Sequence, residues 1–215
     1  MRGVRIVLLS ATCLMLMLSG CRAAYYSTME KFGVEKRHLL KDNVQKAQKE
    51  QQQASEEFKD VLTRIKEIYG FDGGDLEKAY KKLKADYDDC EGRAEAVRSR
   101  IANVEQIAAD LFKEWQQEIN QISNAEFRRN STTSLQETKQ RYARLHDVMV
   151  QAESRLNPVL QQVNDYVLYL KHNLNAQAIG ALRNEVDSIE MEVEALILYM
   201  QRSIQEADAF LADFE

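Results

Sequence analysis

The sequence predicts an all-α protein in which long antiparallel coiled-coil helices form one elongated up-down four-helix bundle. Only one proline and eight glycines occur in 215 residues, too few turn-forming residues for a β-sandwich, a barrel or an α/β fold. Apolar residues make up 45% of the chain and charged residues 29%, a balance typical of folded helical proteins. Four long stretches place apolar residues alternately three and four positions apart, the spacing of helices that coil around one another.

Residues 1–20 have the layout of a secretory signal peptide, which leaves residues 21–215 as a single helical coiled-coil domain. A basic start with two arginines precedes an apolar stretch that is too short to span a bilayer as a stable helix. This stretch ends in Leu18-Ser19-Gly20-Cys21, which resembles the bacterial lipobox. An ordinary signal peptide or a signal anchor is the alternative interpretation.

The cysteine of this tetrad is predicted to anchor the protein to a membrane. By resemblance to bacterial lipoproteins, Cys21 carries the acyl chains, and several chains at about 0.8 kcal/mol per buried methylene hold a protein to a bilayer without a spanning helix. Arg22 rather than aspartate follows the cysteine. In that family this arrangement implies export to the periplasmic face of the outer membrane.

The first two predicted helices cover about 27–69 and 76–123, and a glycine-rich turn at 70–75 separates them. Asp75 is placed to cap the second helix. In the first helix all the inward, or seam, positions but Gln51 are apolar: Leu40, Val44, Ala47, Ala54, Phe58, Val61, Ile65 and Ile68. In the second all but Glu118 are apolar, with Cys90 as a small core residue: Leu76, Tyr80, Leu83, Tyr87, Cys90, Ala94, Val97, Ile101, Val104, Ala108, Leu111, Trp115 and Ile122.

The third and fourth predicted helices cover about 135–172 and 176–214. Ser134 and Glu137 have the spacing of a capping box at the start of the third helix. Pro158 is expected to kink this helix without ending it, because the apolar spacing keeps its phase across the proline. The apolar stripe widens in this pair of helices, which implies more than one neighbour and favours one bundle over two separate hairpins.

Short turns make successive helices antiparallel, so the first and third turns are predicted to lie together, far from the membrane. Phe71 and Asp72 in the first turn, with His172 and Asn173 in the third, form a predicted tip that binds an envelope protein or the cell wall. The alternative is that Phe71 covers the end of the seam and the asparagines only cap helices.

The net charge of the chain is −5, from 29 basic and 34 acidic residues. Removal of Arg2 and Arg5 with the leader leaves 27 basic residues and a net charge of −7, which argues against a nucleic-acid-binding protein. Arg128 and Arg129 lie in the predicted second turn, at the membrane end of an up-down bundle, where they are placed to meet lipid phosphates. Two basic residues in a loop are also commonplace.

The residues favour a non-enzymatic spacer, scaffold or adaptor, because no paired acid and base or activated nucleophile stands out. No cofactor or metal is predicted, since Glu35 and His38 form one Glu-x-x-His motif and a di-iron bundle needs two. The alternative is a metal- or small-ligand-binding bundle. That function would need inward polar side chains, and the seams contain only Gln51, Glu118, Thr138 and Ser203.

Several stretches resemble the signatures of a helical proteobacterial lipoprotein family that is known only as a domain of unknown function. They are residues 25–31, 71–77, 170–176 and 206–210, so the resemblance covers essentially the whole mature chain. It implies an exported helical protein and supplies no catalytic residue. A DNA-repair ATPase label carried by some members conflicts with this sequence, which contains no Gly-Lys pair for a phosphate-binding loop.

Overall fold

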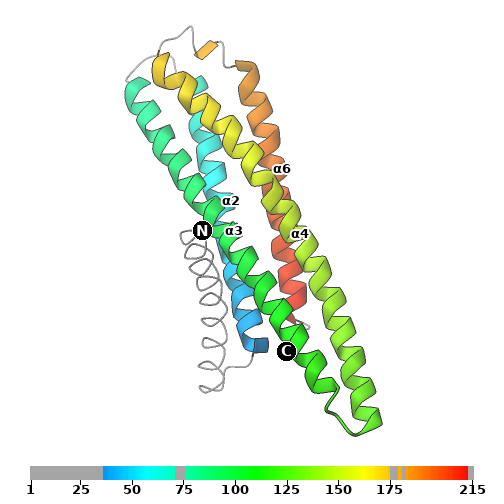
Figure 1. Cartoon of the computed structure of the whole chain (residues 1–215). Coiled ribbons are helices and arrows are strands. Elements are labelled where there is room, and N and C mark those ends of the chain that lie inside the picture. The colour runs from blue at the N-terminus through cyan, green and yellow to red at the C-terminus, as the bar shows by residue number, and fades with distance from the viewer. Residues whose placement is uncertain (1–35, 71–75, 175–178, 181–182, 213–215) are drawn as a thin grey trace, which may run out of the picture.

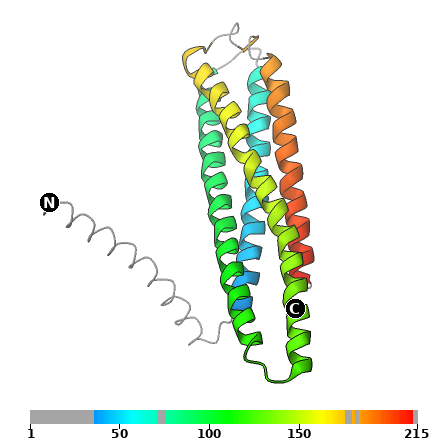
Figure 2. The same ribbon diagram turned by 45° about the vertical axis from the view of Figure 1, so that its right-hand side comes forward.

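Four long helices form the described fold: α2 (Lys36–Tyr69), α3 (Leu76–Ile119), α4 (Ala125–His172) and α6 (Arg183–Ala212). The computed structural model describes residues 36–70, 76–174, 179–180 and 183–212, and no strand occurs among them. Successive helices run antiparallel, and each packs against two neighbours: α2 on α3, α3 on α4, α4 on α6 and α6 on α2 (Figure 1, Figure 2). The predicted elongated up-down four-helix bundle is confirmed.

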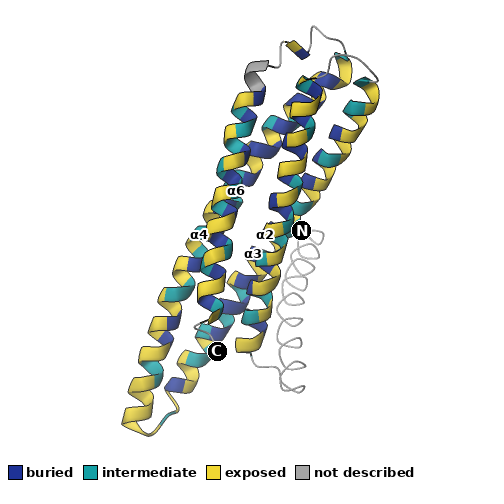
Figure 3. Ribbon diagram, turned by 180° about the vertical axis from the view of Figure 1, so that it is seen from behind, coloured by how far each residue is buried: buried dark blue, intermediate teal, exposed yellow. Residues whose placement is uncertain are grey.

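The predicted seams are the buried stripes of the helices. In α2 the seam residues from Leu40 to Ile68 are at most 1% exposed, and in α6 those from Val186 to Phe210 are at most 5% exposed. Figure 3 shows these buried residues along the inward faces of the helices. Pro158 lies inside α4 without ending it, as the unbroken apolar spacing predicts. The sequence repeat therefore specifies which face of each helix is inward.

The last turns of α3 depart from the predicted seam. Glu118 is exposed where the repeat predicts an inward residue, Ile119 is buried at 3% exposed instead, and α3 ends there rather than near residue 123. The first described residue of α2, Lys36, pairs with Glu114 at 2.7 Å, and the part of the predicted first helix before residue 36 lies outside the described residues.

The structure begins α4 at residue 125 rather than near 135. Asn124 is its N-cap, because the side-chain oxygen accepts hydrogen bonds from the backbone N–H groups of Glu126 (2.9 Å) and Phe127 (3.1 Å). The predicted capping box of Ser134 and Glu137 is wrong, since both residues lie within the helix. Asn124 already satisfies the free donors at the start of α4, so the helix extends through the polar segment.

The α3–α4 hairpin extends past the ends of α2 and α6 (Figure 1, Figure 2). The ring of Phe210, near the end of α6, lies 6.4 Å from that of Tyr142, which is 17 residues beyond the start of α4. At a rise of ~1.5 Å per residue, about 25 Å of α4 lies beyond that contact. We call residues 116–130 the hairpin tip. It includes Arg128 and Arg129, which lie in α4 and not in the predicted loop.

Candidate functional site

The end of the bundle opposite the hairpin tip, here called the distal end, carries the described part of the predicted partner-binding tip. α2 and α4 end there and α3 begins there (Figure 1). His172 is the last residue of α4, and its side chain is exposed. Phe71 and Asp72 lie outside the described residues. Of the four predicted residues, the structure therefore places His172 and Asn173.

Asn173 ends α4 as its C-cap. Its backbone N–H donates to the carbonyl of Leu170 at 3.1 Å, and its side-chain Nδ2 donates to the carbonyl of Tyr169 at 2.8 Å. Both bonds satisfy carbonyl groups that the last turn of a helix leaves free. The amide nitrogen of Asn173 is therefore engaged within the protein, and His172 presents the freer polar group of the two.

Two exposed apolar residues lie beside His172 on the last turns of α4. Leu168 is 50% exposed and Tyr169 is 39% exposed, and they precede His172 by four and three positions, the spacing of neighbours on one helix face. We call Leu168, Tyr169 and His172 the distal patch. Sequence reasoning missed the two apolar members because it followed inward positions alone. The sequence does contain a signal for them, because residues 167–170 are all apolar. A helix can turn only some of four consecutive residues toward the core, so the others must be exposed.

The distal end is well packed beneath this patch. Val167 and Leu170 lie on either side of the exposed pair in the sequence of α4, and both are at most 1% exposed. Partly buried side chains also pack against the core here: Tyr69, Leu76, Ala79, Tyr80 and Leu174. Lys66 of α2 and Glu190 of α6 form an ion pair beside them. The patch therefore stands on a firmly held surface, as a binding site needs.

Cys90, His146 and His38 are further described residues of a kind that could react or bind a metal ion. Cys90 is free and fully buried, and burial, with smaller effects from nearby carboxylates, raises the pKa of its thiol. His146 lies 2.6 Å from Glu105, and His38 is exposed at the far end of α2. Within the described ranges, no group of three or more His, Cys, Asp and Glu side chains could hold a metal ion.

Several polar residues are buried in the described part of the core: Gln51, Ser55, Thr138 and Ser203. Gln51 and Ser203 are fully buried, and their side-chain polar atoms have no hydrogen-bond partner among the residues that the structure describes. Thr138 is 4% exposed and accepts a hydrogen bond from Arg141 at 3.4 Å. Single polar residues at core positions typically fix helix register rather than bind a ligand.

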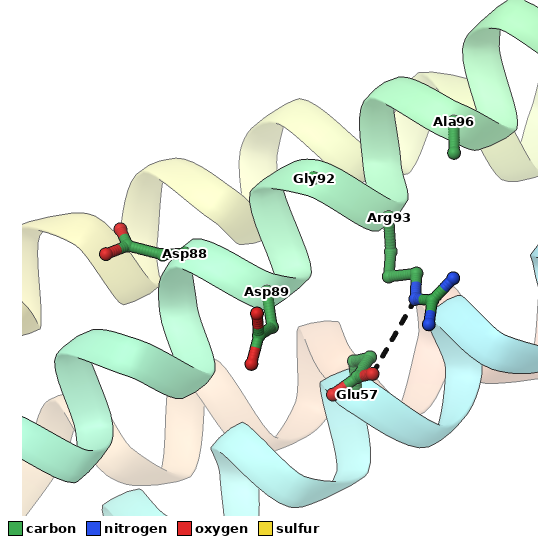
Figure 4. A pocket seen from close by; sticks show the side chains of 6 residues that line it. All are labelled: Glu57, Asp88, Asp89, Gly92, Arg93 and Ala96. Carbon is green, nitrogen blue, oxygen red and sulfur yellow. Dashed lines mark ion pairs between the residues drawn. The ribbon is translucent and has the colours of Figure 1, made fainter.

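An open groove on the outer surface between α2 and α3 is charged rather than apolar (Figure 4). Arg93 pairs with Glu57 and with Glu50, each at 3.6 Å, and donates a hydrogen bond to Gln53 at 3.0 Å. Figure 4 shows Asp88 pointing away from this arginine. The guanidinium is thus held by side chains of α2, and the groove joins two helices through a surface ion network.

The chain was compared with protein-family models, curated proteins and solved structures. The model described as a protein of unknown function (DUF2959) matches residues 25–214. The chain belongs to this family. No curated protein and no solved structure matches the chain. The predicted membership in a helical family of unknown function is confirmed, while the family's description leaves the activity of its members open.

None of the described helices carries a long enough apolar stretch to cross a membrane.

Proposed function

We propose that this DUF2959 protein is a lipid-anchored, non-enzymatic spacer or adaptor of the bacterial envelope. Acyl chains on Cys21 would tether it to the periplasmic face of the outer membrane, with Arg22 directing its sorting. The distal patch would then meet an envelope protein or the cell wall, and nucleic acid is not a partner.

One observation carries the proposal: the two ends of the rod differ, and they lie far apart. α2 begins at the end opposite the distal patch (Figure 1), and residues 22–35 connect it to Cys21. α2 runs from that end to the distal end and contains 34 residues, which is about 51 Å of helix at ~1.5 Å per residue. A tether at one end and an exposed apolar and imidazole patch at the other suit a molecule that holds a partner away from the membrane.

The anchor is tested by fractionation of whole cells and by mass spectrometry of the purified protein. Cys21→Ala should remove the acyl mass and release the protein from membranes or leave it unprocessed. Arg22→Asp should move the acylated protein toward the inner membrane. An unmodified Cys21 in the native protein would overturn the anchor, and an unchanged distribution of Arg22→Asp would overturn the sorting role.

The distal patch is tested by site-specific photocrosslinking in cells. A photoreactive amino acid at position 168 should capture one defined partner, and the same group at Met191, which is 66% exposed on the side of α6, should not. Tyr169→Ser with His172→Ala should abolish the capture without lowering helix content. Equal capture at positions 168 and 191, or capture that survives the double variant, would move the binding surface elsewhere.

The spacer role is tested by length. Removing one heptad from each helix at the same level of the bundle keeps every seam in register and shortens the rod by about 10 Å. A spacer should then lose its cellular effect while the shortened protein still folds and binds its partner in solution. An adaptor whose length is irrelevant would keep its effect.

A further inference from the structure

The hairpin tip is the most exposed part of the described fold. Every residue from Ser123 to Asn130 is exposed, and Figure 3 colours most of the hairpin tip as exposed. Phe127 is 64% exposed there, although an aromatic ring of this size normally packs into a core. Ile122 adds a second apolar side chain that is only half-buried.

Two basic residues follow this aromatic residue in the sequence. Arg128 and Arg129 follow Phe127 in α4, and both are exposed. Neither guanidinium forms an ion pair or a side-chain hydrogen bond with another described residue. Surface arginines elsewhere in the bundle are engaged, as Arg64 is with Asp86 at 2.9 Å. The tip therefore offers an exposed aromatic ring and two exposed guanidinium groups on three consecutive residues of α4.

The tip lies at the end of the bundle to which the proposed lipid leads. α2 begins at the same end, where its first residue Lys36 contacts Glu114, five residues before the end of α3. Residues 22–35 separate Cys21 from α2, and such a segment spans at most about 50 Å when fully extended. The α3–α4 hairpin projects past α2 in the same direction (Figure 2), so among the described residues it lies outermost at this end.

The charge of the tip permits this approach. Glu118 and Glu126 offset Arg128 and Arg129, so the tip is neutral, whereas the chain as a whole carries −5. Glu126 lies in the first turn of α4, where the helix dipole favours a carboxylate. An anionic membrane would therefore repel the acidic sides of the bundle more strongly than it repels the neutral hairpin tip.

We infer that the hairpin tip is a second membrane contact, which binds anionic phospholipid headgroups through Arg128 and Arg129 and places Phe127 at the interface. Guanidinium groups form paired hydrogen bonds with phosphate, and aromatic rings favour the headgroup region. Together with acyl chains on Cys21, this contact holds the rod end-on to the membrane. The inference rests on the proposed lipid anchor, because the tip alone is too small to bind a bilayer durably.

A vesicle assay separates the tip from the anchor. The mature chain carries a hexahistidine tag in place of Cys21 and is tethered to vesicles that contain a nickel-chelating lipid. A fluorescent dye is attached through Asn130→Cys, which leaves Phe127 and both arginines intact. Cys90 stays unlabelled because it is buried. Quenching by nitroxide groups on the acyl chains then reports contact of the dye with the bilayer. A dye attached through Met191→Cys is the matched control on the side of the rod.

On vesicles of phosphatidylethanolamine and phosphatidylglycerol, the dye at position 130 should be quenched and the dye at 191 should not. Each of Arg128→Gln and Arg129→Gln should weaken tip contact about fivefold, the factor that corresponds to ~1 kcal/mol per basic residue at an anionic surface. Phe127→Ser should weaken it further. Quenching should also fall at high salt and on phosphatidylcholine vesicles, since screening removes the ionic part.

Two results would overturn the inference while the tether still holds. Equal quenching at 130 and 191 means that the rod lies flat, and no quenching at 130 means that the tip serves another partner or a second copy. If quenching at position 130 is the same in both arginine variants as in the parent protein, the two arginines do not bind lipid headgroups. Because the tag replaces the lipid, this assay is independent of acylation. A native protein without acyl chains would instead disprove the anchor.

Discussion

The indole nitrogen of Trp115 donates a hydrogen bond to the hydroxyl of Ser131 at 2.9 Å, and this bond joins α3 to α4 at the base of the hairpin tip. Ile119 and Leu135, which lie on the same two helices nearby, are 3% and 2% exposed. The hairpin therefore has buried contacts of its own near its closed end. Its stability should be separable from that of the bundle.

We predict that Ser131→Ala and Trp115→Phe loosen the hairpin tip without unfolding the bundle. Each change removes one neutral hydrogen bond, worth about 1 kcal/mol, and the double variant should cost less than the sum of the two because both remove the same bond. Hydrogen exchange should speed up in residues 116–130 and stay unchanged in the bundle.

The neighbouring Thr132→Ala is a suitable control. Its hydroxyl donates to the carbonyl of Arg128 within the same helix at 2.8 Å, so its loss removes no contact between α3 and α4. If Thr132→Ala accelerated exchange as much as Ser131→Ala does, the bond between Trp115 and Ser131 would not be what joins the two helices.

The second prediction concerns the start of α4. Asn124→Ala should lower the free energy of unfolding by about 0.5–2 kcal/mol, because two backbone N–H groups lose their acceptor. Ser134→Ala should be neutral or slightly stabilising, since Ser134 is exposed inside the helix and alanine has the higher helix propensity. Urea denaturation measures both. The opposite order of the two variants would mean that the helix starts at the later position.

The third prediction concerns the core. Val97 is 1% exposed, so Val97→Asp buries an unpaired carboxylate and should destabilise the bundle by several kcal/mol. Ala102→Asp introduces the same side chain at an exposed position of the same helix and should change stability by about 0.5 kcal/mol or less. Thermal melting followed by circular dichroism distinguishes them. A small cost for Val97→Asp would contradict a tightly packed seam.

The fold could be predicted because a seven-residue repeat reports directly on burial. Phe58 and Ala94 lie at predicted inward positions of different helices, and both are fully buried. The repeat continues through many turns with little interruption, and short turns leave successive helices antiparallel. Local spacing and global packing agree along this part of the chain, so pattern reasoning identified the helix faces.

The hairpin and the distal patch could not be predicted in the same way, because they depend on neighbours. The repeat predicts Glu118 as the inward residue near the end of α3, whereas the structure exposes Glu118 and buries Ile119. Asn124 and Ser134 are both able to cap a helix, and the choice depends on where the hairpin closes. The exposure of Leu168 likewise follows from its place on the outer side of the bundle.

Cys90 provides a test of the core that uses pH. Its thiol is fully buried, and burial raises its pKa above the ordinary value of 9.0. Burial also raises the pKa of Tyr166 to about 12. The native state therefore keeps both protons at a pH at which the unfolded chain begins to release them.

We predict that the bundle loses stability in alkali, and that Cys90 accounts for the first part of the loss. Below about pH 9 the thiol is protonated in both states and has no effect. Above it the unfolded chain binds fewer protons than the native state, so the free energy of unfolding falls by about 1 kcal/mol between about pH 9 and pH 10. Cys90→Ala should remove this part of the decline in the free energy of unfolding. The further decline at higher pH, which the buried tyrosines cause, should remain. Urea denaturation of both proteins across this range measures the difference. Identical declines would mean that the thiol ionises as readily in the folded bundle as in the unfolded chain, which contradicts its burial between the helices.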